Sequence, residues 1–161
     1  MTHLTPERHE WFASTEEQFD LSLSHSACQP LPVGDLLDDA ELKSFTEVDL
    51  GYGGFEGLPE LRSVIADSYD TINSSQVLTF HGPSEAIYTF IRAMLRPGDQ
   101  IVVPSPAFHP LHAIARHIGC EVKEWRATNE QSCTFDVDDL AALCGSPTKL
   151  IVINFPHNPS G

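Results

Sequence analysis

From residue 76 to residue 153, short apolar runs of strand length alternate with amphipathic helical segments. The runs predicted to be strands are 76–81, 101–103, 121–126 and 150–153, and helices are expected at 84–96, 111–118 and 136–144. This alternation is typical of a parallel sheet with right-handed crossover connections. The last run contains no polar residue, so both of its faces are expected to be buried. The pattern predicts an α/β fold, a partial three-layer sandwich with a mostly parallel sheet.

The first part of the chain has a different organisation. Thr5, Pro6 and Glu7 form a helix start signal, and the helix is expected to run to about Phe19. A short helix is expected at 35–45, and a glycine-rich turn at 51–57 leads into a helix opened by Pro59. We therefore predict two parts, an N-terminal helical segment over residues 1–48 and an α/β domain over residues 49–161.

The composition excludes several classes of partner. Nine Lys and Arg against 23 Asp and Glu give a net charge of −14, which argues against binding to nucleic acid or to an anionic membrane surface. The first 20 residues carry charges throughout, so no membrane span is expected there. The histidines at 109, 112 and 117 lack a carboxylate that would complete a metal site. The four cysteines are scattered, without a C-x-x-C pair, which favours reduced thiols in the cytoplasm.

Three loops are expected to meet in space. In open α/β sheets, ligands bind beyond the carboxyl ends of the strands. Here those ends lead into residues 81–84, 104–110 and 154–161. We therefore expect the three loops to converge on one ligand site.

Each loop offers a group suited to a planar, anionic ligand. Gly82, Pro83 and Ser84 open a helix, where free N–H groups, the helix dipole and a hydroxyl can bind an anion; the alternative is a plain serine N-cap. Phe108 can stack on a flat ring or pack in the core. Asn158 presents an amide, although asparagine is also a common turn residue. Neither a Walker loop nor a dinucleotide fingerprint is present.

Five segments, taken in order, resemble the class I/II aminotransferases, which are fold type I enzymes that use pyridoxal 5′-phosphate (PLP). Residues 52–62 resemble the family's Y-x-x-x-x-G-x-x-x-L-R segment, and residues 82–87 its G-A-S-E-A-I phosphate turn. Residues 95–99 resemble L-x-P-G-D, residues 104–108 resemble P-x-P-x-[YF], and residues 154–161 resemble N-x-P-x-N-P-[TS]-G. The resemblance covers about residues 49–161. The stretch from Glu10 to Leu37 resembles the capreomycidine synthase-like branch.

The resemblance implies PLP as the cofactor and a role for each loop. Residues 82–84 would hold the PLP phosphate, although Pro83 lacks the backbone N–H that the family usually has at that position. Phe108 would stack on the pyridine ring, and Asn158 would hydrogen-bond its phenolic oxygen. Tyr52 would reach the cofactor phosphate of a neighbouring subunit, which implies a homodimer with shared sites. Asn154 is expected to stabilise its turn.

The resemblance also implies an activity, amino-group transfer between an amino acid and a 2-oxo acid. In the family, the lysine that forms a Schiff base with PLP lies beyond N-P-[TS]-G, and Lys43, Lys123 and Lys149 do not match it. We therefore expect a fragment that is inactive alone: part of the small domain (1–48) and the N-terminal half of the large domain (49–161). Two alternatives stay open. One is a non-catalytic PLP- or partner-binding α/β module, and the other is an unrelated α/β enzyme or nucleotide binder.

Overall fold

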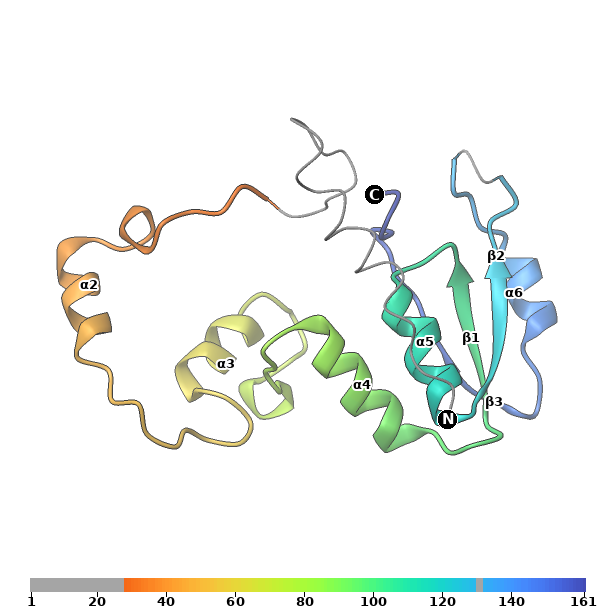
Figure 1. Ribbon diagram of the computed structural model, residues 1–161, viewed down its shortest axis with the longest axis horizontal. Coiled ribbons are helices and arrows are strands. Elements are labelled where there is room, and N and C mark those ends of the chain that lie inside the picture. Colours follow the sequence, from red (N-terminus) through yellow and green to blue (C-terminus); the bar gives the residue numbers. More distant parts are fainter. Residues whose placement is uncertain (1–27, 130–131) are drawn as a thin grey trace, which may run out of the picture. The chain divides into compact units, whose positions relative to one another are not determined.

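The computed structural model of the protein describes residues 28–129 and 132–161 (Figure 1). The helix predicted from Thr5 to about Phe19 lies outside the described residues, as does the first part of the stretch from Glu10 to Leu37. The contacts divide the chain at Gly82, between a unit that contains Leu23–His81 and a unit that contains Gly82–Gly161. Among the described residues, no helix is both long and apolar enough to cross a membrane.

The unit that ends at His81 consists of short helices joined by irregular segments. Its elements are the 3-10 helices η2 (Val33–Asp35) and η3 (Ser74–Gln76) and the α-helices α2 (Asp39–Thr46) and α3 (Pro59–Ala66). The helix predicted at 35–45 starts later than expected, because the Asp38 carboxylate accepts hydrogen bonds from the N–H groups of Ala40 and Glu41 and thereby caps α2. Pro59 opens α3 as predicted.

The strand predicted at 76–81 is wrong, because other partners take its backbone groups. The Val77 carbonyl accepts from Nε of Arg62 at 2.9 Å, and the Val77 N–H bonds back to Ser74. The Thr79 N–H donates to the Glu56 carbonyl at 3.1 Å. The segment is extended, but no strand among the described residues pairs with it. The apolar run at 76–81 therefore indicated an extended backbone, but a local sequence pattern does not show whether another strand lies beside it.

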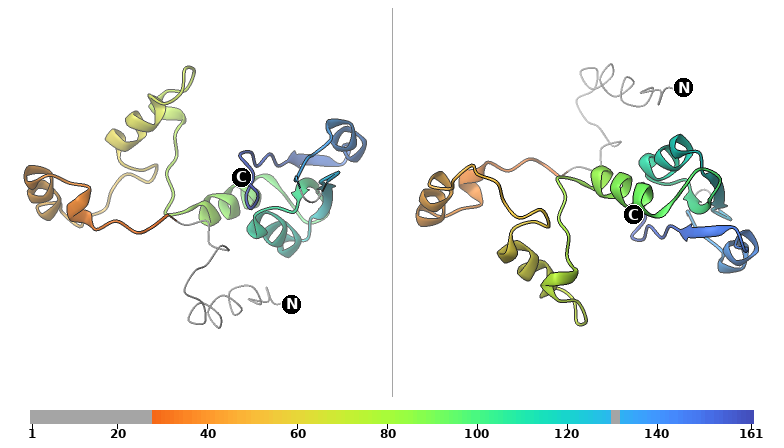
Figure 2. Two further views of the ribbon diagram at one scale, coloured as in Figure 1. Left: turned by 90° about the horizontal axis from the view of Figure 1, so that it is seen from above. Right: turned by 90° about the horizontal axis from the view of Figure 1, so that it is seen from below.

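The unit that begins at Gly82 carries the sheet. Its elements are α4 (Pro83–Met94), β1 (Gln100–Ser105), α5 (His109–Ile118), β2 (Glu121–Arg126), α6 (Val137–Leu143) and β3 (Thr148–Ile151). The strands are parallel and lie in the order β2-β1-β3. Because β2 and β3 lie on opposite sides of β1, right-handed connections place α5 and α6 on opposite faces of the sheet (Figures 1 and 2). The predicted α/β class, parallel sheet and three layers are confirmed.

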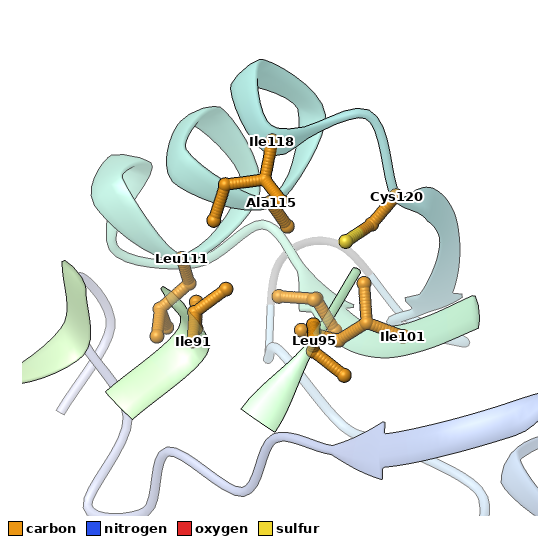
Figure 3. Close-up of a cluster of buried hydrophobic side chains, with 8 residues drawn as sticks. Ile91, Leu95, Ile101, Leu111, Ala115, Ile118 and Cys120 are labelled. Atoms are coloured by element: carbon orange, nitrogen blue, oxygen red, sulfur yellow. The ribbon is translucent and has the colours of Figure 1, made fainter. Parts of the chain in front are cut away.

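The core lies between α4, α5 and β1 (Figure 3). Its buried side chains are Ile91, Leu95, Ile101, Val103, Leu111, Ala115, Ile118 and Cys120. Burial of these side chains from water is the main term that holds the two helices on the sheet. On α4, Ile91 and Leu95 are buried, whereas Phe90 and Met94 on the same helix are more than half exposed. Only the positions that face α5 and β1 are covered.

The prediction that both faces of the last strand are buried is wrong for β3. Its burial alternates along the strand, and Ile151 is 42% exposed. Within the described residues, β3 is an edge strand that pairs with β1 alone. Its apolar composition therefore exceeds what these neighbours cover.

Candidate functional site

The carboxyl ends of the strands define one end of the sheet, at the top of Figure 1. β1 leads into residues 106–108 and then α5, and β3 leads into residues 152–161. α4 ends at Met94, shortly before β1 begins at Gln100. Its first turn lies at the other end of the helix, away from the sheet (Figure 1). The sheet topology thus sends two of the three predicted loops, 104–110 and 154–161, toward the same end.

The first turn of α4 carries the predicted anion-binding residues. Gly82 is the N-cap and Pro83 the first helical residue, and the first intrahelical hydrogen bond runs from Ala86 N–H to the Gly82 carbonyl at 3.3 Å. The Ser84 N–H precedes that bond, and the exposed Ser84 hydroxyl bonds to no described residue. A Cβ built on Gly82 would meet nothing within 4 Å, so packing does not require glycine there. The turn fits a phosphate group, which needs donors and close approach to the backbone.

Phe108 is the N-cap residue of α5, where its carbonyl accepts from the Leu111 N–H at 3.0 Å. The side chain is half-buried and packs against the core cluster. Part of the ring therefore serves the core, and the part that stays exposed is available to a ligand at the carboxyl end of β1. The packing of Phe108 in the core is confirmed in part, and its stacking on a ligand stays a prediction.

Asn158 lies in the turn formed by residues 154–161 and is half-buried. The Asn154 side-chain amide donates to the Asn158 carbonyl at 3.4 Å, which confirms the turn-stabilising role predicted for Asn154. The Gly161 N–H donates to the His157 carbonyl at 2.6 Å and closes the turn. The backbone around Asn158 is thus held on both sides, while no described residue hydrogen-bonds its side-chain amide.

His157 was missed by the sequence reasoning. Its imidazole is 4% exposed and has partners in two loops. Nε2 lies 2.7 Å from the Pro106 carbonyl oxygen, and Nδ1 lies 2.6 Å from the Ser160 hydroxyl. The only signal in the sequence was its position directly before Asn158, in a loop predicted to reach the site. This residue joins the 106–108 loop to the 154–161 turn.

Aromatic rings surround His157 and fix its location. Phe135 and Phe155 have ring centroids 5.4 Å and 5.9 Å from the imidazole, and Trp125 packs 5.0 Å from Phe135. The Trp125 indole N–H donates to the Asp136 carbonyl at 2.7 Å, which satisfies its polar group. The cluster draws on β2, on the segment before α6 and on the segment after β3.

Tyr52 belongs to the other unit, and its side chain is fully exposed. Of the three predicted loops, the structure brings together 104–110 and 154–161, through the hydrogen bond of His157 to Pro106. The convergence of Gly82, Pro83 and Ser84 with Phe108 and Asn158 stays a prediction, and so does any role of Tyr52. Among the described residues no group of His, Cys, Asp or Glu is placed to hold a metal ion.

His112 is a titratable residue of α5 that interacts with the backbone of Pro104, near the end of β1. Burial lowers the pKa of His112, the nearby Arg116 lowers it further, and an interaction with the Pro104 backbone partly offsets the two. Its Nδ1 atom is buried without a hydrogen-bond partner in the described part of the chain. His112 is therefore a neutral core residue that supports the strand end, and not a ligand of the site.

Comparison with known proteins gives a consistent result. The model of the family described as aminotransferase class I and II matches residues 32–161. Capreomycidine synthase from Streptomyces vinaceus is 35% identical over 156 residues, which cover 94% of this chain and 40% of that protein. A solved PLP-dependent aminotransferase from Streptococcus suis 89-1591 has a TM-score of 0.89 at 24% identity, covering 99% of this chain and 44% of that one, which shows a shared fold.

A further solved structure, the PLP-dependent cyclase OrfR, has a TM-score of 0.78 at 29% identity and covers 100% of this chain and 43% of that one. The chain thus spans less than half the length of each of these relatives. The family match includes the α4 turn and both of the loops that His157 joins. Because this match extends over most of its length, the chain belongs to the aminotransferase class I and II family.

Proposed function

We propose that this chain contributes the phosphate turn and part of the ring pocket of a PLP-dependent aminotransferase. The observation that carries the proposal is the first turn of α4, where the Ser84 N–H and hydroxyl are available and nothing crowds Gly82. The family match and the PLP-dependent relatives support the same cofactor. When bound, PLP withdraws electrons from the substrate's α-carbon and so makes amino-group transfer possible.

The phosphate is assigned to the start of α4. Ser84 donates from its N–H and its hydroxyl, and the helix dipole adds a favourable potential for an anion. Gly82 allows close approach of the backbone. Pro83 contributes a fixed φ at the first helical position but no donor, so its role is to shape the turn.

The pyridine ring is assigned to the two loops at the carboxyl end of the sheet. The exposed part of Phe108 stacks on the ring, and the Asn158 amide donates to its phenolic oxygen. Support comes from the half-buried positions of both side chains and from the contact that holds their loops together. Tyr52 is assigned to the phosphate of a neighbouring subunit in a homodimer, and its full exposure within one chain is compatible with that.

The whole protein would act on an amino acid and a 2-oxo acid, in the cytoplasm.

Titration of the chain with PLP, followed by 31P NMR of the phosphate, tests the site. We expect saturable binding that Ser84→Ala weakens about tenfold or more, since a hydrogen bond to a charged group contributes about 1.5–3 kcal/mol. Ser146→Ala, an exposed serine in another turn, is the control. Equal PLP affinity in wild type and Ser84→Ala would contradict the assignment.

A second candidate reaction is an intramolecular cyclisation that uses the same cofactor. The similarity to the PLP-dependent cyclase OrfR favours it. The two reactions have different product balances. A transaminase forms one 2-oxo acid for each amino group transferred and needs an acceptor, whereas a cyclase converts its amino acid with no acceptor. Product analysis of the full-length protein with and without a 2-oxo acid separates them.

A further inference from the structure

We infer that His157 is a positioning residue for the cofactor ring: its buried imidazole fixes the 106–108 loop against the 154–161 turn, so that Phe108 and Asn158 address the same ligand. The inference rests on the proposed function. Among the described residues, no hydrogen bond of Phe108 or Asn158 reaches the other residue's loop, whereas the imidazole of His157 bonds directly to the Pro106 carbonyl.

The two hydrogen bonds of His157 have different effects. The bond from Nε2 to the Pro106 carbonyl, at 2.7 Å, joins two loops that are 51 residues apart in the chain. The bond between Nδ1 and the Ser160 hydroxyl, at 2.6 Å, stays within one turn. Only the first bond can fix Asn158 relative to Phe108.

The chemistry of the partners sets the tautomer. A carbonyl oxygen only accepts, so Nε2 carries the proton and donates to Pro106. In the neutral ring Nδ1 then accepts from the Ser160 hydroxyl. Both nitrogens are satisfied, which explains how a polar side chain that is 4% exposed is tolerated between two aromatic rings, those of Phe135 and Phe155.

Because of the position of His157 in the chain, its hydrogen bond to Pro106 can align Asn158 with Phe108. His157 directly precedes Asn158, and Pro106 lies two residues before Phe108. The hydrogen bond therefore fixes the backbone next to Asn158 and the backbone two residues before Phe108. Loss of the bond is expected to disturb ring recognition and leave the start of α4, which binds phosphate, unchanged.

Two probes separate these effects in the full chain. 4′-Deoxypyridoxine 5′-phosphate carries the ring, the phenolic oxygen and the phosphate but no aldehyde, so it forms no lysine adducts. Inorganic phosphate tests the α4 turn alone. Both affinities are measured by 31P NMR at constant ionic strength. We expect His157→Leu to weaken the ring probe about tenfold, as two hydrogen bonds are lost, and to leave inorganic phosphate within twofold.

Two conservative variants test which bond matters. The amide of His157→Gln reaches the Nε2 position and donates to Pro106, so it should restore most of the affinity for the ring probe. The amide of His157→Asn reaches only the Nδ1 position and bonds to Ser160, so it should not. Long-range 15N NMR of the wild-type imidazole should show the Nε2–H tautomer.

The outcomes distinguish the inference from the function on which it rests. Failure of wild type to bind either probe contradicts the proposed function. Wild-type binding with equal losses for both probes in His157→Leu and His157→Asn shows general destabilisation and overturns the inference alone. Unchanged ring-probe affinity in His157→Leu, or an Nδ1–H tautomer in the wild type, also overturns it. If His157→Leu does not fold, the comparison of His157→Gln with His157→Asn decides.

Discussion

At the residue scale, the first turn of α4 contains one residue that can donate hydrogen bonds to an anion, Ser84, and one that cannot, Pro83. Ser84 brings two donors to the turn, whereas Pro83 brings none. Proline at this position departs from the family pattern, and the structure places Pro83 as the first helical residue of α4. In the proposed function, the turn would therefore offer phosphate one N–H donor fewer than the family pattern does.

Pro83→Ala should strengthen phosphate binding, because it adds an N–H at the first helical position. We expect about tenfold tighter PLP binding, the lower end for a hydrogen bond to a charged group, since alanine fixes φ less firmly than proline. Pro59→Ala is a matched control, because Pro59 opens α3 in the same way but lies in the other unit. PLP titration with 31P detection measures both. Weaker binding in Pro83→Ala would show that proline is needed to shape the turn.

His112 makes the stability of the core dependent on pH. Because its pKa is lowered in the folded state, the unfolded chain binds the proton more readily, so stability is complete above the unfolded value of 6.5 and declines as pH falls below it. Urea unfolding at pH 8 and pH 5 should show a smaller acid-induced loss in His112→Gln than in wild type. His117→Gln, at an exposed position on the same helix, should retain the wild-type loss. Equal pH dependence in all three would contradict this role.

At the scale of elements, two residues that begin and end helices were predicted correctly from the sequence, whereas the neighbours of two extended segments, 76–81 and β3, were not. Asp136 caps α6 and Gly119 ends α5 with φ 93°, at the start and the end that the sequence predicted for the helices at 136–144 and 111–118. These signals act within a few residues, so the sequence contains them in full. The extended segment after η3 and the exposed face of β3 depend on neighbours distant in the chain, which local pattern does not encode. For the same reason, His157 was missed and Phe108 was left between two interpretations.

Gly119 and Gly98 allow a matched test of the α5–β2 turn. Both have positive φ, 93 and 90, but a Cβ on Gly119 would lie 3.3 Å from the Pro97 Cβ, whereas one on Gly98 would meet nothing within 4 Å. Alanine at either position should cost about 1–2 kcal/mol in backbone strain. Gly119→Ala should cost more, because the Pro97 ring must also move. Free energies of unfolding in urea measure the difference, and equal costs would show that the contact is relieved freely.

At the scale of the whole molecule, the predicted parts and the observed units differ in where they divide the chain. The sequence suggested a division between residues 48 and 49, just before the glycine-rich turn, whereas the contacts divide the chain at Gly82. The segment from Leu50 to His81 is held by local interactions, chiefly those of Arg62, which bonds to Glu56, Ser74 and Val77. The assignment of residues 1–48 and 49–161 to the small and large domains of a full-length enzyme stays a proposal.

The positions of the lysines lead to a prediction about covalent PLP attachment by this chain. Lys123 lies mid-strand, opposite Val102, and pairs with Glu121 at 2.6 Å. Lys149 lies at the amino end of β3, and Lys43 pairs with Glu47 on α2. Neither strand lysine lies at the carboxyl end of the sheet, where the proposed ring pocket is.

Treatment of the chain with PLP and borohydride should therefore give only scattered adducts, each well below one per chain, and no amino-acid turnover. Mass spectrometry of the digested protein locates and quantifies them. Addition of 4′-deoxypyridoxine 5′-phosphate should not suppress these adducts, because they form by solution chemistry at exposed amines and not in the pocket. Lys→Arg substitution at each of the three positions should remove one adduct and leave non-covalent PLP affinity unchanged. A single stoichiometric adduct that the competitor suppresses, together with turnover, would mean that one of these lysines reaches the cofactor ring and that the pocket is not where the α4 turn and the His157-linked loops place it.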